Sequence, residues 1–143
     1  MGYGVSACAT CDGFFFKDKN VFVVGGGDSA MEEATFLTKF ASSVTLVHRR
    51  DKFRASKIMQ KRALDNSKID VIWNSSVVEL IGDETKNGLE KVILKDTNTG
   101  LQTEHKIDGL FLGIGHKPNS QVFKKYLNLD KQGYILTNPG TTI

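Results

Sequence analysis

Two cysteines, Cys8 and Cys11, stand three positions apart near the start of the chain, and the sequence has no others. A structural zinc ion would need two further ligands, and none of His48, His105 and His116 lies at a local spacing from the pair. A purely structural disulfide would close a very short loop and remove little entropy from the unfolded chain. The spacing therefore favours a redox dithiol in a reducing compartment.

A glycine-rich turn is the second chemical feature. Residues 25–30 read Gly-Gly-Gly-Asp-Ser-Ala and fit the G-x-G-x-x-A fingerprint of a dinucleotide-binding turn. Gly25 permits the tight turn, Gly27 lets the backbone approach a pyrophosphate, and Ala30 lets the helix pack close to the strand. The first amides of that helix would bind the phosphates. A glycine connection without a ligand is the alternative, and the flanking strand and helix patterns favour binding.

Basic residues crowd into positions 48–54, which read His-Arg-Arg-Asp-Lys-Phe-Arg. Taken alone, such a run indicates a solvated helix start. In an NAD-binding unit, however, the second strand ends in an acid that binds the ribose 2′-hydroxyl. Here His48, Arg49 and Arg50 stand at that tip, and Arg54 follows one turn later. Guanidinium groups bind a 2′-phosphate through charge-assisted hydrogen bonds, so we expect the cofactor to be NADPH.

The elements that must position these residues follow the hydrophobic pattern. Short runs of apolar, β-branched residues predict buried parallel strands at residues 21–24, 44–47, 69–73 and 109–112. Alternating stretches predict an inserted antiparallel meander at residues 77–81, 89–95 and 103–107.

Helical spacing predicts two helices between these strands. The first follows the glycines and is closed by Ser42-Ser43, and the second covers residues 55–64 with Ile58, Met59 and Leu64 facing inward. A proline and an asparagine at residues 117–119 indicate the first linker.

Composition sets limits on function. A chain of 143 residues, with 40% hydrophobic and 24% charged residues, is ordinary for one globular domain. The net charge of +3 is too small to indicate nucleic-acid binding. The longest apolar stretch, residues 109–115, is far shorter than the roughly 18 residues of a membrane span, and the opening residues lack a secretory-signal pattern. We expect a cytoplasmic protein without membrane or nucleic-acid partners.

Four segments in the same order resemble the low-molecular-weight thioredoxin reductases. They are Cys8-Ala9-Thr10-Cys11-Asp12-Gly13, residues 25–30, residues 48–54 and Gly113-Ile114-Gly115-His116-Lys117-Pro118-Asn119. The resemblance covers almost the whole chain. It implies an oxidoreductase of α/β fold class, with a Rossmann-like parallel sheet, flanking helices and an inserted antiparallel β-meander, which is the three-layer ββα arrangement of FAD/NAD(P)-binding proteins.

The resemblance also implies roles. Cys11 would receive electrons from the flavin, Cys8 would attack the disulfide of thioredoxin, and Asp12 would handle the proton. Gly115 and His116 would lie near the nucleotide. The plain alternatives are that Asp12 is a turn acid and His116 a linker residue. Fingerprint, basic run and resemblance together give the expected nucleotide-binding residues: Gly25, Gly27, Asp28, Ser29, Ala30, His48, Arg49, Arg50, Arg54, Gly115 and His116.

In that family the FAD domain is discontinuous and surrounds the NADPH-binding domain. We therefore expect residues 1–116 to be an NADPH-binding domain with a redox dithiol, and residues 117–143 to begin the returning, otherwise absent, FAD domain. The intact flavoprotein would be a homodimer that reduces thioredoxin, and this chain alone would be inactive for lack of an FAD site. Two alternatives are an inactive NADPH- or thioredoxin-binding module, and a relative of the flavin subunit of alkyl hydroperoxide reductase, which has an acid at the second strand tip and prefers NADH.

Overall fold

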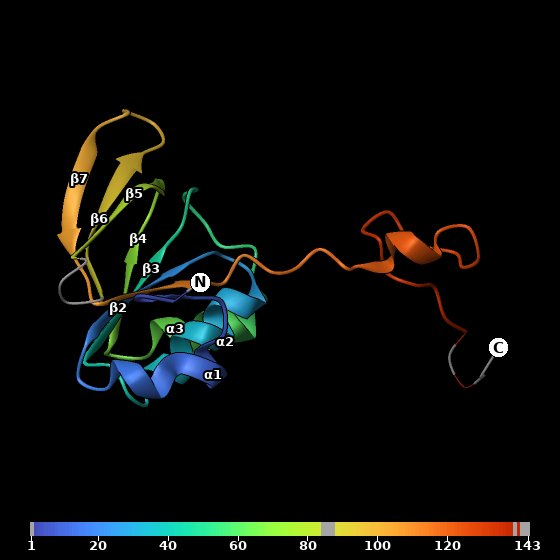
Figure 1. Ribbon diagram of the computed structural model, residues 1–143, viewed down its shortest axis with the longest axis horizontal. Coiled ribbons are helices and arrows are strands. Elements are labelled where there is room, and N and C mark those ends of the chain that lie inside the picture. Colours follow the sequence, from blue (N-terminus) through green and yellow to red (C-terminus); the bar gives the residue numbers. More distant parts are fainter. Residues whose placement is uncertain (1, 84–87, 139, 141–143) are drawn as a thin grey trace.

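Three layers make up the body of the molecule, with an antiparallel sheet above, a parallel sheet in the middle and helices below (Figure 1). The computed structural model describes residues 2–83, 88–138 and 140. The parallel sheet has the strand order β1-β8-β2-β3-β4, and the antiparallel sheet has the order β5-β6-β7. This confirms the expected fold class.

The elements have the following bounds. The parallel strands are Val5–Ser6 (β1), Asn20–Val24 (β2), Ser43–Val47 (β3), Ile69–Ile72 (β4) and Gly109–Leu112 (β8). The antiparallel strands are Ser75–Asp83 (β5), Gly88–Asp96 (β6) and Gln102–Lys106 (β7). The helices are Ala9–Asp12 (α1), Asp28–Leu37 (α2) and Lys57–Leu64 (α3), with 3₁₀ turns at Gly13–Phe16 (η1) and Ser120–Phe123 (η2).

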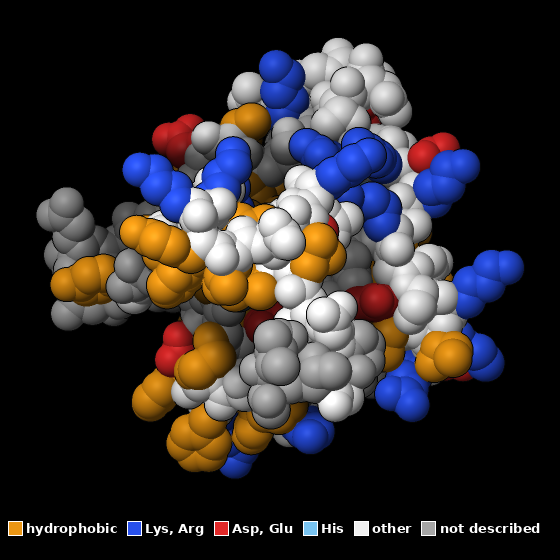
Figure 2. All heavy atoms as spheres, turned by 90° about the vertical axis from the view of Figure 1, so that its right-hand side faces the viewer, with side chains coloured by type: hydrophobic (Ala, Val, Ile, Leu, Met, Phe, Trp, Pro, Cys, Tyr) orange, Lys and Arg blue, Asp and Glu red, His pale blue; other side chains and the backbone are white. Residues whose placement is uncertain are grey.

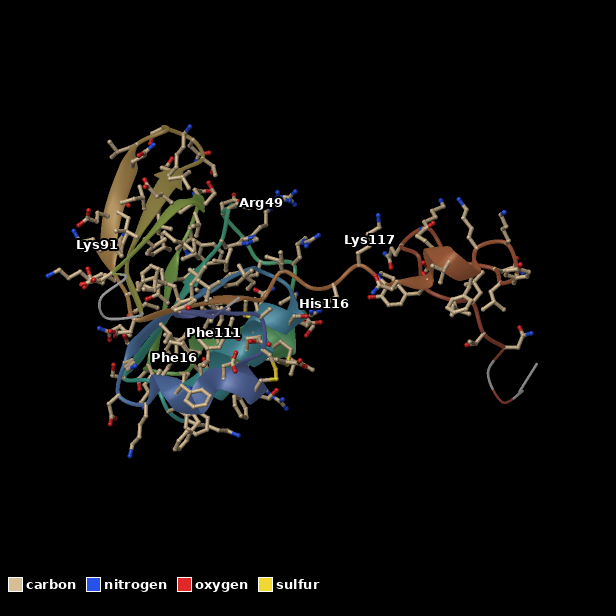
Figure 3. The ribbon with its side chains drawn as sticks, viewed as in Figure 1. Phe16, Arg49, Lys91, Phe111, His116 and Lys117 are labelled. Atoms are coloured by element: carbon tan, nitrogen blue, oxygen red, sulfur yellow. A yellow bond between two sulfur atoms is a disulfide. The ribbon has the colours of Figure 1, made fainter. Side chains whose placement is uncertain are left out.

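The central parallel strands β2 and β8 are mostly apolar because they are buried on both faces. In β2, Val21 and Val23 belong to the core shared with the helices, while Phe22 between them belongs to the core shared with the antiparallel sheet. On the helix side, Phe16 of η1 packs edge-to-face against Phe111 of β8, with ring centroids 5.1 Å apart (Figure 3). The middle sheet is therefore held by two separate cores.

The strand pairing brings three loops to one edge of the sheet. Val24, the last residue of β2, is in register with Val47 of β3 on one side and with Leu112 of β8 on the other. All three strands are parallel, so the loops that follow them, at residues 25–27, 48–50 and 113–115, leave the sheet at the same end. The glycine turn and the basic run thus meet, as the sequence predicts.

Two sequence predictions about the helices are wrong. The helix after the glycines ends at Leu37 rather than at Ser42. In the second helix, Met59 packs on the core as predicted, but Ile58 is 69% and Leu64 49% exposed, and Ala63 is fully buried instead. Met59 and Ala63 lie four residues apart on one helix face, and the small alanine lets that face approach the core closely.

The C-terminal segment, residues 117–138, extends away from the layered body (Figure 1). Most of its apolar side chains are exposed, and the view toward this end shows hydrophobic side chains at the surface (Figure 2). Those side chains are Val122, Phe123, Tyr126, Leu127, Tyr134, Ile135 and Leu136. The expected domain boundary at residue 117 stays a prediction, and positions 139 and 141–143 of that expected domain lie outside the described residues.

No helix in the described part of the chain is both long and apolar enough to cross a bilayer. Within the same residues, the acids, histidines and cysteines form no group of three that could hold a metal ion.

Candidate functional site

A disulfide joins Cys8 to Cys11 across the single turn of α1, with the two Cα atoms 5.3 Å apart. Cys8 is the N-cap of this helix, and its Sγ accepts a hydrogen bond from the backbone N–H of Cys11 at 3.2 Å. Cys8 is half-buried and Cys11 is exposed. The two thiols that the spacing marks as a redox pair are therefore close enough to interconvert between dithiol and disulfide.

Asp12 is held beside this disulfide by Ser6, a residue that the sequence did not single out. The Ser6 hydroxyl donates to Oδ2 of Asp12 at 2.6 Å, and its oxygen accepts from the N–H of Cys8 at 3.1 Å. Ser6 is only 4% exposed. It lies in the two-residue strand β1, which is too short to leave a periodic signal in the sequence. A carboxylate is thus fixed within the dithiol turn.

The glycine turn fits tightly against its neighbours at one end and is open at the other. Gly25 has φ +153°, and a Cβ there would lie 2.3 Å from the carbonyl oxygen of Gly113 and 2.8 Å from Cβ of Ala30. Only glycine at position 25, with a small residue at position 30, permits this close approach. At Gly27 a Cβ would meet nothing within 4 Å, so the backbone there faces open space.

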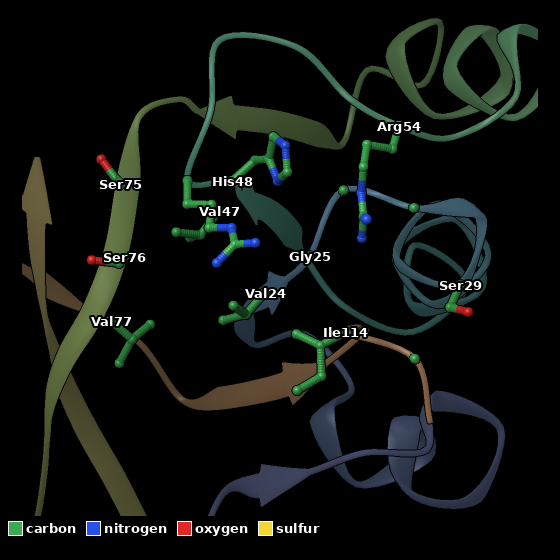
Figure 4. A pocket seen from close by; sticks show the side chains of 15 residues that line it. Val24, Gly25, Ser29, Val47, His48, Arg54, Ser75, Ser76, Val77 and Ile114 are labelled. Atoms are coloured by element: carbon green, nitrogen blue, oxygen red, sulfur yellow. The ribbon is translucent and has the colours of Figure 1, made fainter. Parts of the chain in front are cut away.

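That open space is a cavity of about 600 Å³ at the edge where the three loops meet (Figure 4). It brings together many of the predicted residues. Its lining comprises Val24, Gly25, Gly26, Gly27, Ser29, Val47, His48, Arg49, Arg54, Ser75, Ser76, Val77, Gly113, Ile114 and Gly115. Arg54, the last residue of the basic run, extends over the cavity (Figure 4). The wall formed by β5 was not foreseen, because only the stacking of the two sheets brings it here.

Four predicted residues lie outside this lining. Arg50 is exposed, and Ala30 is buried beneath the turn. Asp28 uses its Oδ1 to accept the N–H of Ser56 at 2.7 Å, so it ties α2 to the loop before α3. His116 lines an adjoining hollow, which shares Ser29, Ile114 and Gly115 with the cavity.

His48 lies under the glycine turn and is only 6% exposed. Its Nε2 is 3.1 Å from the carbonyl oxygen of Lys52, and because a carbonyl only accepts, this nitrogen is the donor. The ring packs against Phe53 and Trp73, with centroids 5.4 and 6.2 Å away. Burial is the main cause that lowers the pKa of His48, and the neighbouring arginines lower it further. The imidazole is therefore neutral near pH 7, unlike the guanidinium groups beside it.

The loop that contains Arg54 is fastened to the glycine turn. The carbonyl oxygen of Gly26 accepts hydrogen bonds from the N–H groups of Arg54 at 2.7 Å and Ala55 at 3.0 Å. On the other side of the cavity, the hydroxyl of Thr97 lies 3.2 Å from the carbonyl oxygen of Arg49. The backbone of both Arg49 and Arg54 is therefore fixed by hydrogen bonds, so their side chains extend from defined positions at the cavity.

The chain belongs to the pyridine nucleotide-disulphide oxidoreductase family, whose family model matches residues 1–142. It is 55% identical over 141 residues to thioredoxin reductase 2 of Arabidopsis thaliana, which covers 97% of this chain and 37% of the relative. It is also 54% identical over 142 residues to a bifunctional thioredoxin reductase/thioredoxin of Mycobacterium leprae, which covers 99% of this chain and 30% of the relative.

Solved structures agree with these relatives. A thioredoxin reductase from Giardia duodenalis superposes with a TM-score of 0.86 at 41% identity, covering 97% of this chain and 45% of that one. The chain therefore spans less than half the length of the relatives it matches. The identification as a thioredoxin reductase relative, made from four short segments of sequence, is confirmed.

Proposed function

We propose that this chain is the NADPH-binding and redox-dithiol part of a thioredoxin reductase, which passes electrons from NADPH through FAD to Cys8 and Cys11 and on to thioredoxin. The observation that carries the proposal is that α2 contributes to both sites. Its first turn borders the nucleotide-sized cavity, and its second turn contacts the disulfide-bearing helix α1. The names of the relatives, one of which joins a reductase with a thioredoxin, support the same assignment.

The residues at the cavity fit NADPH. The empty Cβ position at Gly27 leaves room for a pyrophosphate against the backbone, and the ten-residue helix α2 presents its first amides there. Arg49 and Arg54 at the cavity supply guanidinium groups for a 2′-phosphate, and no described acid lines it. His48 supports the loop from below. A relative of the alkyl hydroperoxide reductase flavin subunit, which would use NADH, is disfavoured by the same arginines.

The dithiol would act by thiol–disulfide exchange. The Cys8 thiolate attacks one sulfur of the thioredoxin disulfide and forms a mixed disulfide, with release of one thioredoxin thiolate. Cys11 then attacks the Cys8 sulfur, which releases the second thiolate and restores the Cys8–Cys11 disulfide. The two protons that leave the cysteines end on the two thioredoxin thiols, and the carboxylate of Asp12 is placed to carry one of them.

Renewed reduction of the disulfide requires a flavin, because a nicotinamide and a dithiol exchange a hydride poorly without one. FAD, when bound, supplies the relay that takes a hydride from NADPH and delivers two electrons to the disulfide. We propose that the flavin is held by the part of such a reductase that this chain does not span, that the intact enzyme is a homodimer in the cytoplasm, and that this chain alone does not turn over.

Two measurements on this chain test the proposal without flavin turnover. Calorimetry should show binding of NADPH that is on the order of 10² to 10⁴ times tighter than binding of NADH. Equilibration with thioredoxin of known redox state should show that Cys8 and Cys11 form a two-electron couple with a reduction potential of about −270 mV. Equal affinity for the two nucleotides, failure to exchange with thioredoxin, or stoichiometric zinc on the cysteines would each contradict it. A flavin absorption spectrum in the purified chain would contradict the claim that FAD is held elsewhere.

A further inference from the structure

The dithiol helix and the nucleotide-side helix are joined by a carboxylate. The backbone N–H of Ala9, the residue after Cys8, donates to Oε2 of Glu33 in the second turn of α2 at 2.8 Å. Ala9 is 1% exposed and part of the core, and Glu33 is half-buried. Residues 24 positions apart are thus linked at the point where the disulfide turn begins.

Directly after α1, the chain makes apolar contacts with the end of α2. A Cβ at Gly13, the first residue of η1, would lie 3.3 Å from Leu37 at the end of α2 and 3.5 Å from Phe40 just beyond it, so this part of the chain packs closely on the end of α2. Apolar packing fixes the distance between two helices but tolerates sliding better than a directional hydrogen bond does. The hydrogen bond from Ala9 to Glu33 therefore adds a directional contact at the end of α1 that carries Cys8.

We propose that Glu33 is a positioning residue for the dithiol, which fixes the Cys8 end of α1 to α2 and holds a carboxylate at the backbone N–H of the residue that follows Cys8. The inference rests on the proposed function, because it takes Cys8 as the attacking thiol. The nearby charge disfavours the thiolate of Cys8 relative to the thiol, as like charges do at close range. Asp12 on α1 is the other carboxylate with a hydrogen bond in this turn, and Ser6 already holds it.

Glutamine at position 33 separates the two parts of this role. Glu33→Gln keeps an oxygen that accepts the Ala9 N–H and removes only the charge. Glu33→Ala removes both. Glu32→Gln is the matched control, because Glu32 is the neighbouring acid on the same helix and is exposed. Each variant changes the net charge of the chain equally.

The experiment uses the full chain, reduced with a phosphine that is then removed. Iodoacetamide is added at pH 7, and the rate of Cys8 labelling is followed by mass spectrometry of peptides. Amide exchange at Ala9 is measured in parallel on the oxidised chain. Glu33→Gln should label Cys8 about three- to ten-fold faster than the parent and leave Ala9 protection unchanged. Glu33→Ala should lose that protection, and Glu32→Gln should match the parent in both.

Labelling of Glu33→Gln at the parental rate would overturn the electrostatic role, and retained Ala9 protection in Glu33→Ala would overturn the positioning role. An equal acceleration in Glu32→Gln would also contradict the proposal, since the effect would then be one of overall charge. None of these readouts needs NADPH, FAD or thioredoxin. Failure of the proposed function would show instead in the calorimetry and the thioredoxin equilibrium, so the two failures are distinguishable.

Discussion

The imidazole of His48 occupies the space where a side chain at Gly26 would be. A Cβ at Gly26 would lie 2.3 Å from both Cε1 and Nδ1 of the His48 ring, far inside van der Waals contact. The fingerprint allows any residue at this middle position. In this chain the buried histidine, rather than the nucleotide, explains why the position is glycine.

Gly26→Ala should therefore destabilise the fold. Because Phe53 and Trp73 enclose the His48 ring, the ring cannot move aside freely, and we expect a loss of about 1–3 kcal/mol in the free energy of unfolding. Gly27→Ala is the matched comparison, since its Cβ would enter open space at an ordinary φ of −99°. It should change stability by less than about 1 kcal/mol yet weaken NADPH binding at least about tenfold. Urea unfolding and calorimetry measure the two effects.

The buried histidine should also make stability depend on pH. The pKa of His48 is lowered in the folded chain from its ordinary value of 6.5, so the unfolded chain binds this proton more readily. Stability is then fully present above about pH 6.5 and decreases as the pH falls below it, by at most about 1.4 kcal/mol per pH unit. His48→Asn should reduce this slope between pH 7 and 5, whereas His116→Asn, at an exposed position, should keep it. An unchanged slope in His48→Asn would contradict the assignment.

Nucleotide preference should depend on the arginines that line the cavity. Each charge-assisted hydrogen bond to a 2′-phosphate contributes about 1.5–3 kcal/mol, so Arg49→Ala and Arg54→Ala should each weaken NADPH binding by roughly 10- to 100-fold. NADH binding should hardly change, and higher salt should narrow the difference between the nucleotides in the parent. Arg62→Ala, on the exposed face of α3, is the control and should leave both affinities alone. An equal loss of affinity for NADPH and NADH would show that the arginines do not bind the 2′-phosphate.

The C-terminal segment should be less protected than the sheets. Val122 is 73% and Tyr126 is 83% exposed, so few apolar contacts offset the cost of ordering this part of the chain. We expect amides in residues 117–138 to exchange with deuterium much faster than those of β2 and β8. Protection equal to that of the sheet would show that the domain boundary at residue 117 is wrong.

The sequence predicted the strands well and the polar contacts poorly. Strands such as β2 and β8 are buried on both faces, and their apolar runs locate them to within a residue. For α3, Met59 was predicted correctly, but hydrophobicity alone also favoured Ile58, which is exposed, over Ala63, which is fully buried.

The candidate site was likewise predicted only in part. The glycine turn and the cysteine pair are local in sequence and were predicted. Ser6 and Glu33 were not, because each acts through a hydrogen bond that exists only once β1 and α2 are packed beside α1. Polar residues of this kind have no periodicity to reveal them.

The antiparallel sheet also bears on how this scaffold could be re-engineered. Phe22, Val47 and Leu110 of the middle layer form a core with Val92 and Leu94 of β6, and β5 supplies one wall of the cavity. A minimal binder trimmed to the parallel strands and α2 would leave that apolar face open to water and invite self-association. The meander is therefore needed in any shortened version of this fold.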